Sequence, residues 1–217
     1  LLVVDAAETF FFKRTTPVMP FMADITLTLS IGDMAEDAVA GNGTIDTLTP
    51  AIFPSIAFDS GNQVRFGRLV LSNAHGSEVL SLPVPAETQF WNGTGFIRNS
   101  ADFCTQLAAA NVGLSNWRRN LNACETSVAL SGRFNAGRGN LKLSAPGANN
   151  TGSVDLTMNL AAAGAGSTCP VGTVTGADKA WLQGKGSGAA YDQNPVARGS
   201  FGLYRGNKPL IYIREMY

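Results

Sequence analysis

The sequence predicts an all-β protein, an antiparallel β-sandwich with one short helix and long loops. Two observations lead to this prediction. Short runs in which apolar and polar residues alternate recur along the chain, and this period of two is typical of strands with one buried face. Turn-forming residues separate the runs, since 24 of the 217 residues are glycine and 10 are proline.

The first clear strand lies near the N-terminus. From Ile25 to Ile31, isoleucine and leucine alternate with threonine and serine, so this segment is expected to be a half-buried strand. Residues 1–20 before it are apolar but irregular. Residues 32–55 after it contain small polar residues and two prolines, which predicts a long connection.

The alternation of apolar and polar residues returns at residue 64, but its parity changes within the strand. Val64 and Phe66 share one parity, whereas Leu69 and Leu71 share the other. Because one inserted residue moves every later side chain to the opposite face, this change indicates a β-bulge at Gly67.

The next strand is expected to pair with the previous one. Residues 73–76 have the composition of a hairpin-type connection, and residues 79–84 alternate again. Pro83 and Pro85 share a parity, so both missing N–H groups lie on one side of that strand. A strand without donors on one side is expected at a sheet edge.

The short helix is expected over residues 100–110. Asn99-Ser100-Ala101-Asp102 has the composition of a helix start, and Phe103 and Leu107 would then share one face. Further strands are indicated at 128–130, 141–143, 154–160, 200–205 and 210–217, and residues 161–177 are expected to form a loop or an insert. Residues 210–213 are apolar at both parities, so the last strand is expected inside a sheet.

Composition limits the function classes. Lysine plus arginine and aspartate plus glutamate both total 16, so the formal net charge is zero. Nucleic-acid binding normally needs a basic excess, which makes a nucleic-acid partner unexpected. No apolar run approaches the roughly 20 residues of a membrane-spanning helix. Low charge with abundant small polar residues is typical of exported β-proteins.

The three cysteines, Cys104, Cys124 and Cys169, predict one disulfide and one remaining thiol. Three pairings are open, and spacing alone does not choose among them. The disulfide is expected between Cys104 and Cys124, because that pairing closes a short loop. With a single histidine and no CxxC pair, a structural zinc site is not expected.

No catalytic or cofactor-binding motif is recognisable. Nucleophile elbows and phosphate-binding loops are absent, and His75 is expected in an exposed turn. A glycosidase would need a pair of carboxylates, yet no acidic motif points to one. Asp59, Asp155 or Asp192 beside loop carbonyls would suit calcium, but solvated loops explain them better. The sequence therefore predicts neither enzyme activity, nor a metal, nor a cofactor.

The three tryptophans are candidates for stacking on a sugar. Trp91 is the best of them, because the turn-forming Asn92-Gly93-Thr94-Gly95 follows it directly. The simpler interpretation, which we prefer, is that Trp91, Trp117 and Trp181 fill gaps in the core or at a seam.

Several segments in order resemble the C-terminal region of MshQ-like proteins, which are large exported proteins encoded among the genes for mannose-sensitive haemagglutinin type IV pili. The resemblance covers roughly residues 21–217 and leaves residues 1–20 outside it. The segments are residues 56–61, 65–69, 73–78, 82–85, 89–93, 137–139, 144–147, 152–156, 181–184, 192–195, 201–205 and 212–217.

The resemblance implies a β-domain over residues 21–217, as one unit or two packed ones, at the surface of a Gram-negative bacterium. We expect a non-enzymatic structural or adhesive module of a pilus-associated protein, whose partners are pilus or other surface proteins. A first alternative is a subunit of a filament that assembles by strand addition. A second is a β-sandwich that binds or acts on polysaccharide.

Overall fold

The computed structural model describes residues 14–22, 24–29, 51–57 and 63–202. The strand expected at residues 210–217 therefore lies outside the described residues, as does most of the long connection at residues 32–55. Among the described residues, no helix is long and apolar enough to span a membrane.

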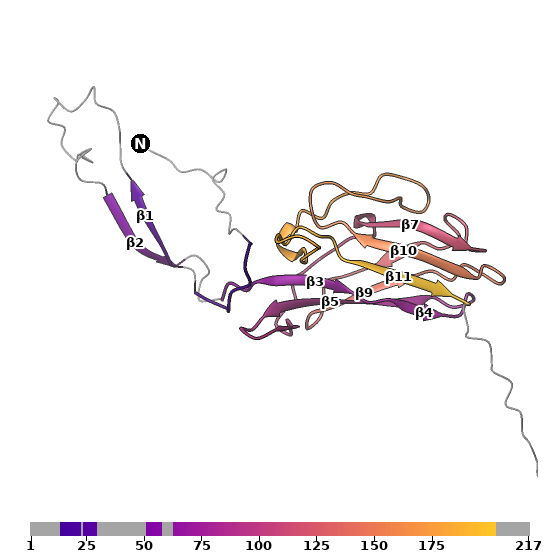
Figure 1. Ribbon diagram of the computed structural model, residues 1–217, viewed down its shortest axis with the longest axis horizontal. Coiled ribbons are helices and arrows are strands. Elements are labelled where there is room, and N and C mark those ends of the chain that lie inside the picture. Colours follow the sequence, from indigo (N-terminus) through magenta and orange to yellow (C-terminus); the bar gives the residue numbers. More distant parts are fainter. Residues whose placement is uncertain (1–13, 23, 30–50, 58–62, 203–217) are drawn as a thin grey trace, which may run out of the picture.

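Two β-sheets form a sandwich, and a separate two-stranded sheet precedes it (Figure 1). The first sheet, here called the β5 sheet, has the order β3-β5-β9-β8, and β6 pairs with β5 beyond this path. The second, the β10 sheet, has the order β4-β11-β10-β7. The strands are β1 (Asp24–Leu29), β2 (Ala51–Ala57), β3 (Gly67–Leu71), β4 (Ala74–Gly76), β5 (Leu82–Trp91), β6 (Phe96–Arg98), β7 (Val112–Arg119), β8 (Val128–Leu130), β9 (Arg138–Leu143), β10 (Gly152–Met158) and β11 (Val196–Phe201).

The predicted all-β sandwich is confirmed. All strand pairs are antiparallel except β4 with β11, which is parallel. Strand β1 pairs with β2 in a hairpin that lies apart from both sandwich sheets in Figure 1. The expected strand at 25–31 corresponds to β1, although the burial of its side chains is not described.

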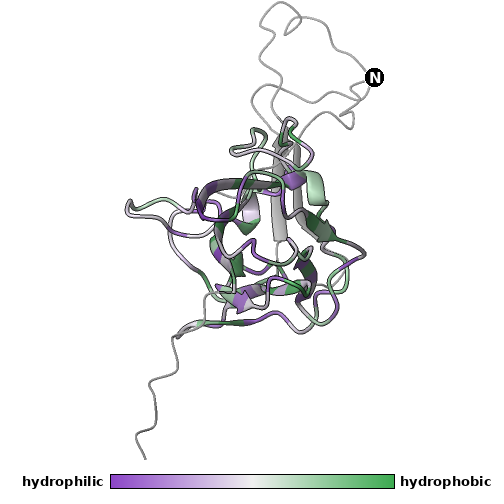
Figure 2. Ribbon diagram, turned by 90° about the vertical axis from the view of Figure 1, so that its right-hand side faces the viewer, coloured by the Kyte–Doolittle hydropathy of each residue, from purple (hydrophilic) through white to green (hydrophobic). Residues whose placement is uncertain are grey.

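The core lies between the two sheets, where alternate residues of each strand meet. Leu82, Val84 and Ala86 of β5 are buried, as are Leu156 and Met158 of β10. The intervening residues of β5 point outward, and Pro83 and Pro85 are exposed. The alternation of buried and outward residues along β5 is the period-two pattern that the sequence displays. An end-on view shows that the described part of the chain carries both hydrophobic and hydrophilic residues (Figure 2).

The prediction that the proline-containing strand forms a sheet edge is wrong for β5 as a whole, because β5 lies between β3 and β9. The prolines still obey the physical rule. Strand β3 ends at Leu71 opposite Ala86, and the last bond to it runs from the Ser72 N–H to the Pro85 carbonyl at 3.0 Å. Both prolines therefore turn their missing donors to the side that β3 no longer covers.

The expected hairpin at residues 73–76 is also replaced by a longer connection. Ten residues, 72–81, join β3 to β5, and within them β4 crosses to the other sheet and pairs in parallel with β11. His75 therefore lies in a short exposed edge strand and not in a turn. The cause is tertiary, because β4 gains hydrogen bonds from a strand more than 120 residues away in sequence.

No α-helix forms over residues 100–110, so that prediction is wrong. The buried Asp102 carboxylate accepts bonds from the Thr88 hydroxyl at 2.7 Å, the Thr105 N–H at 2.9 Å and the Cys104 N–H at 3.2 Å. Burial raises the pKa of Asp102, but these hydrogen bonds outweigh it and the pKa lies below its ordinary value. The acid that suggested a helix start instead closes a turn.

Two short 3₁₀ helices are the helical elements of the described residues: η1 (Ala109–Asn111) and η2 (Ala180–Leu182). The backbone that was expected to be helical pairs elsewhere. The Thr105 carbonyl accepts the Phe134 N–H at 2.8 Å, and Gln106 forms a bridge with Arg133. Extended pairing with a distant segment thus satisfies the groups that a helix would have used.

The disulfide joins Cys124 to Cys169, with their Cα atoms 5.1 Å apart, and Cys104 is a free, exposed cysteine. The predicted Cys104–Cys124 pairing is therefore wrong. The loop at residues 161–177 folds back along β7, where Leu114 and Ser167 exchange two backbone hydrogen bonds of 2.9 and 3.1 Å. This return places Cys169 beside Cys124 although 45 residues separate them in sequence.

Close backbone contact explains why this loop follows β7. A side chain at Gly113 would place its Cβ 1.8 Å from the Ala165 carbonyl oxygen, so only glycine permits the approach. The buried Asn159 holds the same loop, because its side chain bonds both the N–H and the carbonyl of Ala165, at 2.8 and 3.1 Å.

We expect the Cys124–Cys169 bond to contribute about 4 kcal/mol to the free energy of unfolding, as the loop-closure model gives for this separation. Replacing both cysteines by serine should lower the unfolding midpoint in denaturant by a corresponding amount. Cys104→Ser is the matched control and should leave the midpoint unchanged. Non-reducing peptide mapping that recovers Cys104 in a disulfide would contradict the pairing.

Candidate functional site: an aromatic and arginine-rich surface

The candidate site lies on the outer face of the β5 sheet, at the end where β5 finishes and β3 begins (Figure 1). Strand pairing sets Trp91 of β5 opposite Phe96 of β6, and the next outward pair is Gln89 with Arg98. Gln89 also pairs with Arg68 of β3 on its other side. Residues opposite one another on neighbouring strands project to the same face, so these side chains share one surface.

Four aromatic residues gather here, and we call them the aromatic end: Phe66, Trp91, Phe96 and Tyr191. Trp91 and Phe96 meet edge-to-face with ring centroids 5.3 Å apart, and Phe66 and Tyr191 do so at 4.8 Å. Phe96 lies 6.3 Å from both Phe66 and Tyr191. Phe66 is buried, whereas the other three rings are half-buried and reach the surface.

The turn between β5 and β6 sets the position of Trp91. The Asn92 side-chain oxygen accepts bonds from the Thr94 N–H at 3.0 Å and the Gly95 N–H at 2.9 Å. Gly93 adopts a φ of 108°, a conformation that other residues rarely take. This tight turn brings Trp91 and Phe96 side by side, and it is the turn that the sequence places after Trp91.

Two arginines lie over the aromatic rings. The Arg68 guanidinium is 3.9 Å from the Phe96 ring centroid, and its Nε and NH2 groups donate to the Gln89 side-chain oxygen at 3.0 and 2.8 Å. The Arg14 guanidinium lies 4.6 Å from the Phe66 centroid and 5.7 Å from that of Tyr191. Such stacking combines cation–π attraction with packing.

Arg14 ties the segment before the sandwich to the aromatic end. Its guanidinium donates to the carbonyls of Gly67, Gln183 at 3.2 Å and Ala180 at 3.0 Å, so it joins the start of β3 to η2. Burial lowers the pKa of Arg14, although the group stays charged at neutral pH. Arg14 is therefore held against the sandwich, a long-range contact that local sequence patterns do not predict.

The other tryptophans have different surroundings. Trp117 is partly buried and packs against the core, which agrees with the gap-filling interpretation. Trp181 is 57% exposed, with the Lys179 ammonium 5.4 Å from its ring, so it does not fill a core gap. Trp91 lies between these cases, half-buried in the aromatic end with part of its ring at the surface.

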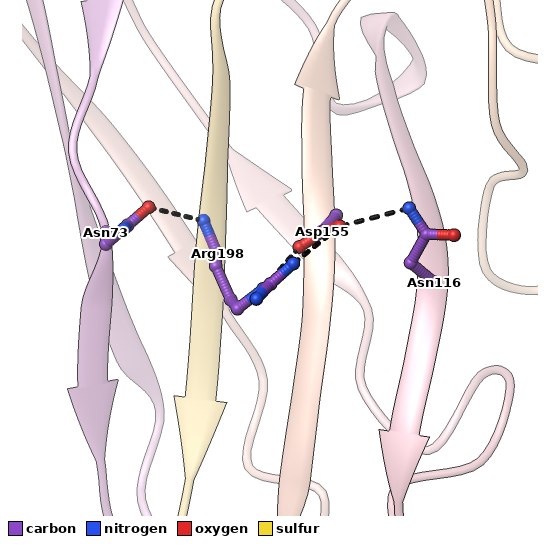
Figure 3. A network of polar contacts seen from close by, with 4 residues as sticks. All are labelled: Asn73, Asn116, Asp155 and Arg198. Atoms are coloured by element: carbon purple, nitrogen blue, oxygen red, sulfur yellow. Dashed lines mark hydrogen bonds and ion pairs between the residues drawn. The ribbon is translucent and has the colours of Figure 1, made fainter.

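The polar candidates are not gathered at this site. Asp155 lies on the outer face of the β10 sheet, where it accepts from Arg198 Nε at 2.6 Å and Arg198 NH2 at 3.1 Å. Asn116 donates to the same carboxylate at 3.0 Å, and Asn73 accepts the Arg198 backbone N–H at 2.8 Å (Figure 3). The network runs from Asn73, just before β4, through Arg198 of β11 and Asp155 of β10 to Asn116 of β7, and so links neighbouring strands of the sheet.

The remaining residues considered for metal binding or catalysis, Asp192, His75 and Asp59, do not form a cluster in the described part of the chain either. Asp192 is exposed and is bonded by the Gln193 side chain at 3.1 Å. His75 is exposed on β4, and Asp59 lies outside the described residues. Within the described part of the chain, no group of three or more His, Cys, Asp or Glu side chains lies close enough to hold a metal ion.

Sequence reasoning identified Trp91 but missed the residues around it. Phe66, Phe96 and Arg68 reach Trp91 through strand register, which only the pairing of β3, β5 and β6 reveals. Arg14 and Tyr191 come from opposite ends of the chain. One local signal was available: Arg68 has the parity opposite to that of Leu69 and Leu71, which places it on the other face of β3.

We expect Arg14→Ala to lower the free energy of unfolding by about 2 kcal/mol, because three carbonyls lose a charged donor. Arg14→Lys keeps the positive charge but lacks the planar guanidinium with its several N–H donors, so it should recover only part of the lost stability. Denaturant unfolding of both variants measures this difference. Equal stability of Arg14→Ala and the parent would show that the contact contributes nothing.

The free energy of unfolding should depend on pH through the carboxyl group of Asp155. The hydrogen bond from Arg198 lowers its pKa most, burial raises it, and Asn116 and the charges of Arg198 and Arg118 lower it further. A carboxyl group with a lowered pKa stabilises the fold above its unfolded pKa of about 3.9, and this contribution is lost as the pH falls through the folded pKa.

Asp155→Asn should therefore lower the melting temperature by about 2 °C at pH 7, and the difference from the parent should narrow below about pH 3.9. Asp192→Asn, at an exposed acid without an ion pair, is the control and should change little. A difference between Asp155→Asn and parent that is constant from pH 7 to pH 2 would contradict this assignment.

Comparison with known proteins identifies a family but no characterised relative. No curated protein and no solved structure matches the chain. The family model described as "DUF6701, fourth domain" matches residues 65–216, which is well over half of the 217 residues and includes every sandwich strand. All four residues of the aromatic end also fall inside the match, whereas Arg14 precedes it. The chain thus belongs to the DUF6701 fourth-domain family.

Proposed function

We propose that this chain is a non-enzymatic structural or adhesive module of an exported bacterial surface protein. The observation that supports it best is the aromatic end, where Trp91, Phe96 and Tyr191 reach the surface together with Arg68. Half-buried rings combined with guanidinium groups are typical of recognition surfaces, where aromatic residues and arginine are enriched.

Support for export comes from the disulfide. Bonds such as Cys124–Cys169 persist in oxidising surroundings and are rare in the reducing cytosol. The bond links the turn after β7 to the long loop at residues 161–177, where it restricts the unfolded chain and so stabilises the fold. The exported location is thus part of the proposal.

The pilus-associated role is the finer part of this proposal. It rests on the resemblance of ordered segments to the C-terminal region of MshQ-like proteins. The description of the matched family as a fourth domain supports a chain that is one part of a longer multidomain protein. If the chain has this role, its binding partner is a pilus protein or another protein of the cell surface.

The filament alternative receives less support. Addition of a strand needs a long accessible edge, and β4 at one edge of the β10 sheet has three residues. At the opposite edge, the loop carrying Ser167 already bonds Leu114 of β7. Electron microscopy of the purified chain tests this alternative directly, and ordered filaments would favour it over the adhesive module.

A glycan array with the full chain tests the adhesive proposal. We expect retention of at least one glycan class, and we expect the retained glycan to be recovered uncleaved. Trp91→Ala should weaken retention about tenfold, since stacking on a ring contributes on the order of 1 kcal/mol or more. Phe103→Ala removes an exposed ring elsewhere and is the matched control.

Cleavage of the retained glycan would instead identify an enzyme and overturn the proposal. Equal weakening by Trp91→Ala and Phe103→Ala would show that the aromatic end is not the binding surface. The melting temperatures of both variants are measured alongside, so that a loss of fold is not mistaken for a loss of contact.

A further inference from the structure

We propose that the outer face of the β5 sheet binds an acidic polysaccharide, which lies along β5 and β9 with one end at the aromatic end. This inference rests on the adhesive function proposed above and names the chemistry of its ligand. It depends on the register of the sheet, which places a set of cations on one face.

Strand pairing shows which residues share that face. Trp91, Gln89, Glu87, Pro85 and Pro83 of β5 point outward, because Leu82, Val84, Ala86 and Thr88 between them are buried. Their partners point the same way. These partners are Phe96 and Arg98 on β6, Arg68 and Val70 on β3, and Arg138, Asn140 and Lys142 on β9.

The resulting charge is strongly one-sided. The face holds four cations, Arg68, Arg98, Arg138 and Lys142, against the single carboxylate of Glu87. The chain as a whole has equal numbers of basic and acidic residues, so this excess is local. Glu87 accepts a bond from the Gln89 amide at 3.0 Å, and the one ion pair among the described residues lies on the other sheet.

The cations are also accessible. Arg98, Arg138 and Lys142 are exposed, whereas Arg68 is half-buried against Phe96. Four positive groups without carboxylate partners repel one another and attract a polyanion, so charge complementarity selects an acidic partner. Arg14 adds a further positive charge at the aromatic end, above Phe66.

The shape of the face favours a linear sugar polymer. The cations flank β5 from Gln89 to Pro83, a stretch of about 20 Å at the ordinary rise of a strand. It is the face of a pleated sheet and not a closed pocket, and Trp91 and Phe96 continue it at one end with aromatic rings. Rings that stack on sugars beside guanidinium groups that pair with carboxylates suit acidic sugars in particular.

The test is binding of the full chain to polygalacturonate, measured by biolayer interferometry at low and at high salt. Neutral dextran, polyglutamate and single-stranded DNA are the comparison polymers. Arg138→Gln combined with Lys142→Gln removes two exposed cations that form no ion pair with the residues that the structure describes. Arg118→Gln combined with Arg119→Gln removes the same charge from exposed positions of β7 on the opposite sheet.

We expect polygalacturonate to bind more tightly than the other three polymers, and high salt to weaken the binding. The β9 double variant should bind at least about tenfold more weakly, since each surface cation near a polyanion changes affinity on the order of fivefold. The β7 double variant should keep the parent affinity, and both variants should melt near the parent temperature.

Four results would overturn the inference. Equal binding of DNA or polyglutamate would show a general polyanion surface, and equal loss in both double variants would show that the β5 sheet is not the site. Binding to neutral glycans on the array, without binding to polygalacturonate, would overturn the acidic ligand and leave the adhesive function standing. Failure on the array and with polygalacturonate alike would overturn both.

Discussion

Strand β5 has to bury one face and expose the other, and most of the molecule is arranged around this constraint. Its inward residues, Leu82, Val84 and Ala86, lie in the core against the β10 sheet. Its two edges are hydrogen-bonded to β3 and β9. Burial of a leucine or valine side chain contributes roughly 1.5 to 3 kcal/mol, so the register of β5 is strongly determined.

That register also creates the candidate site. If β5 slipped by one residue, Trp91 and Gln89 would turn inward and the buried leucine and valine would turn to solvent. Because the core forbids the slip, Trp91 stays beside Phe96, and Arg68 stays within reach of both Gln89 and the Phe96 ring. Packing on one face of the sheet thus organises recognition chemistry on the other.

The β10 sheet is stabilised by different means. Its outer face is held by the ion pair of Asp155 with Arg198 and by the asparagines on either side. The disulfide and the Leu114–Ser167 bonds hold the long loop against its edge strand β7. These contacts cover part of an edge that would otherwise be open to pairing with other chains.

The all-β class, the strands with clear alternation and the choice of Trp91 as a candidate surface residue followed from local sequence signals, namely the period of two and the turn residues. These signals did not determine the pairing of Cys124 with Cys169, the crossing of β4 to the other sheet or the absence of the helix at 100–110. In each case distant segments supply the partners: Ser167 beside Leu114, β11 beside β4, and Arg133 beside Gln106. These features depend on long-range contacts, because a buried backbone group needs a hydrogen-bond partner, and in the folded chain that partner can come from a distant segment.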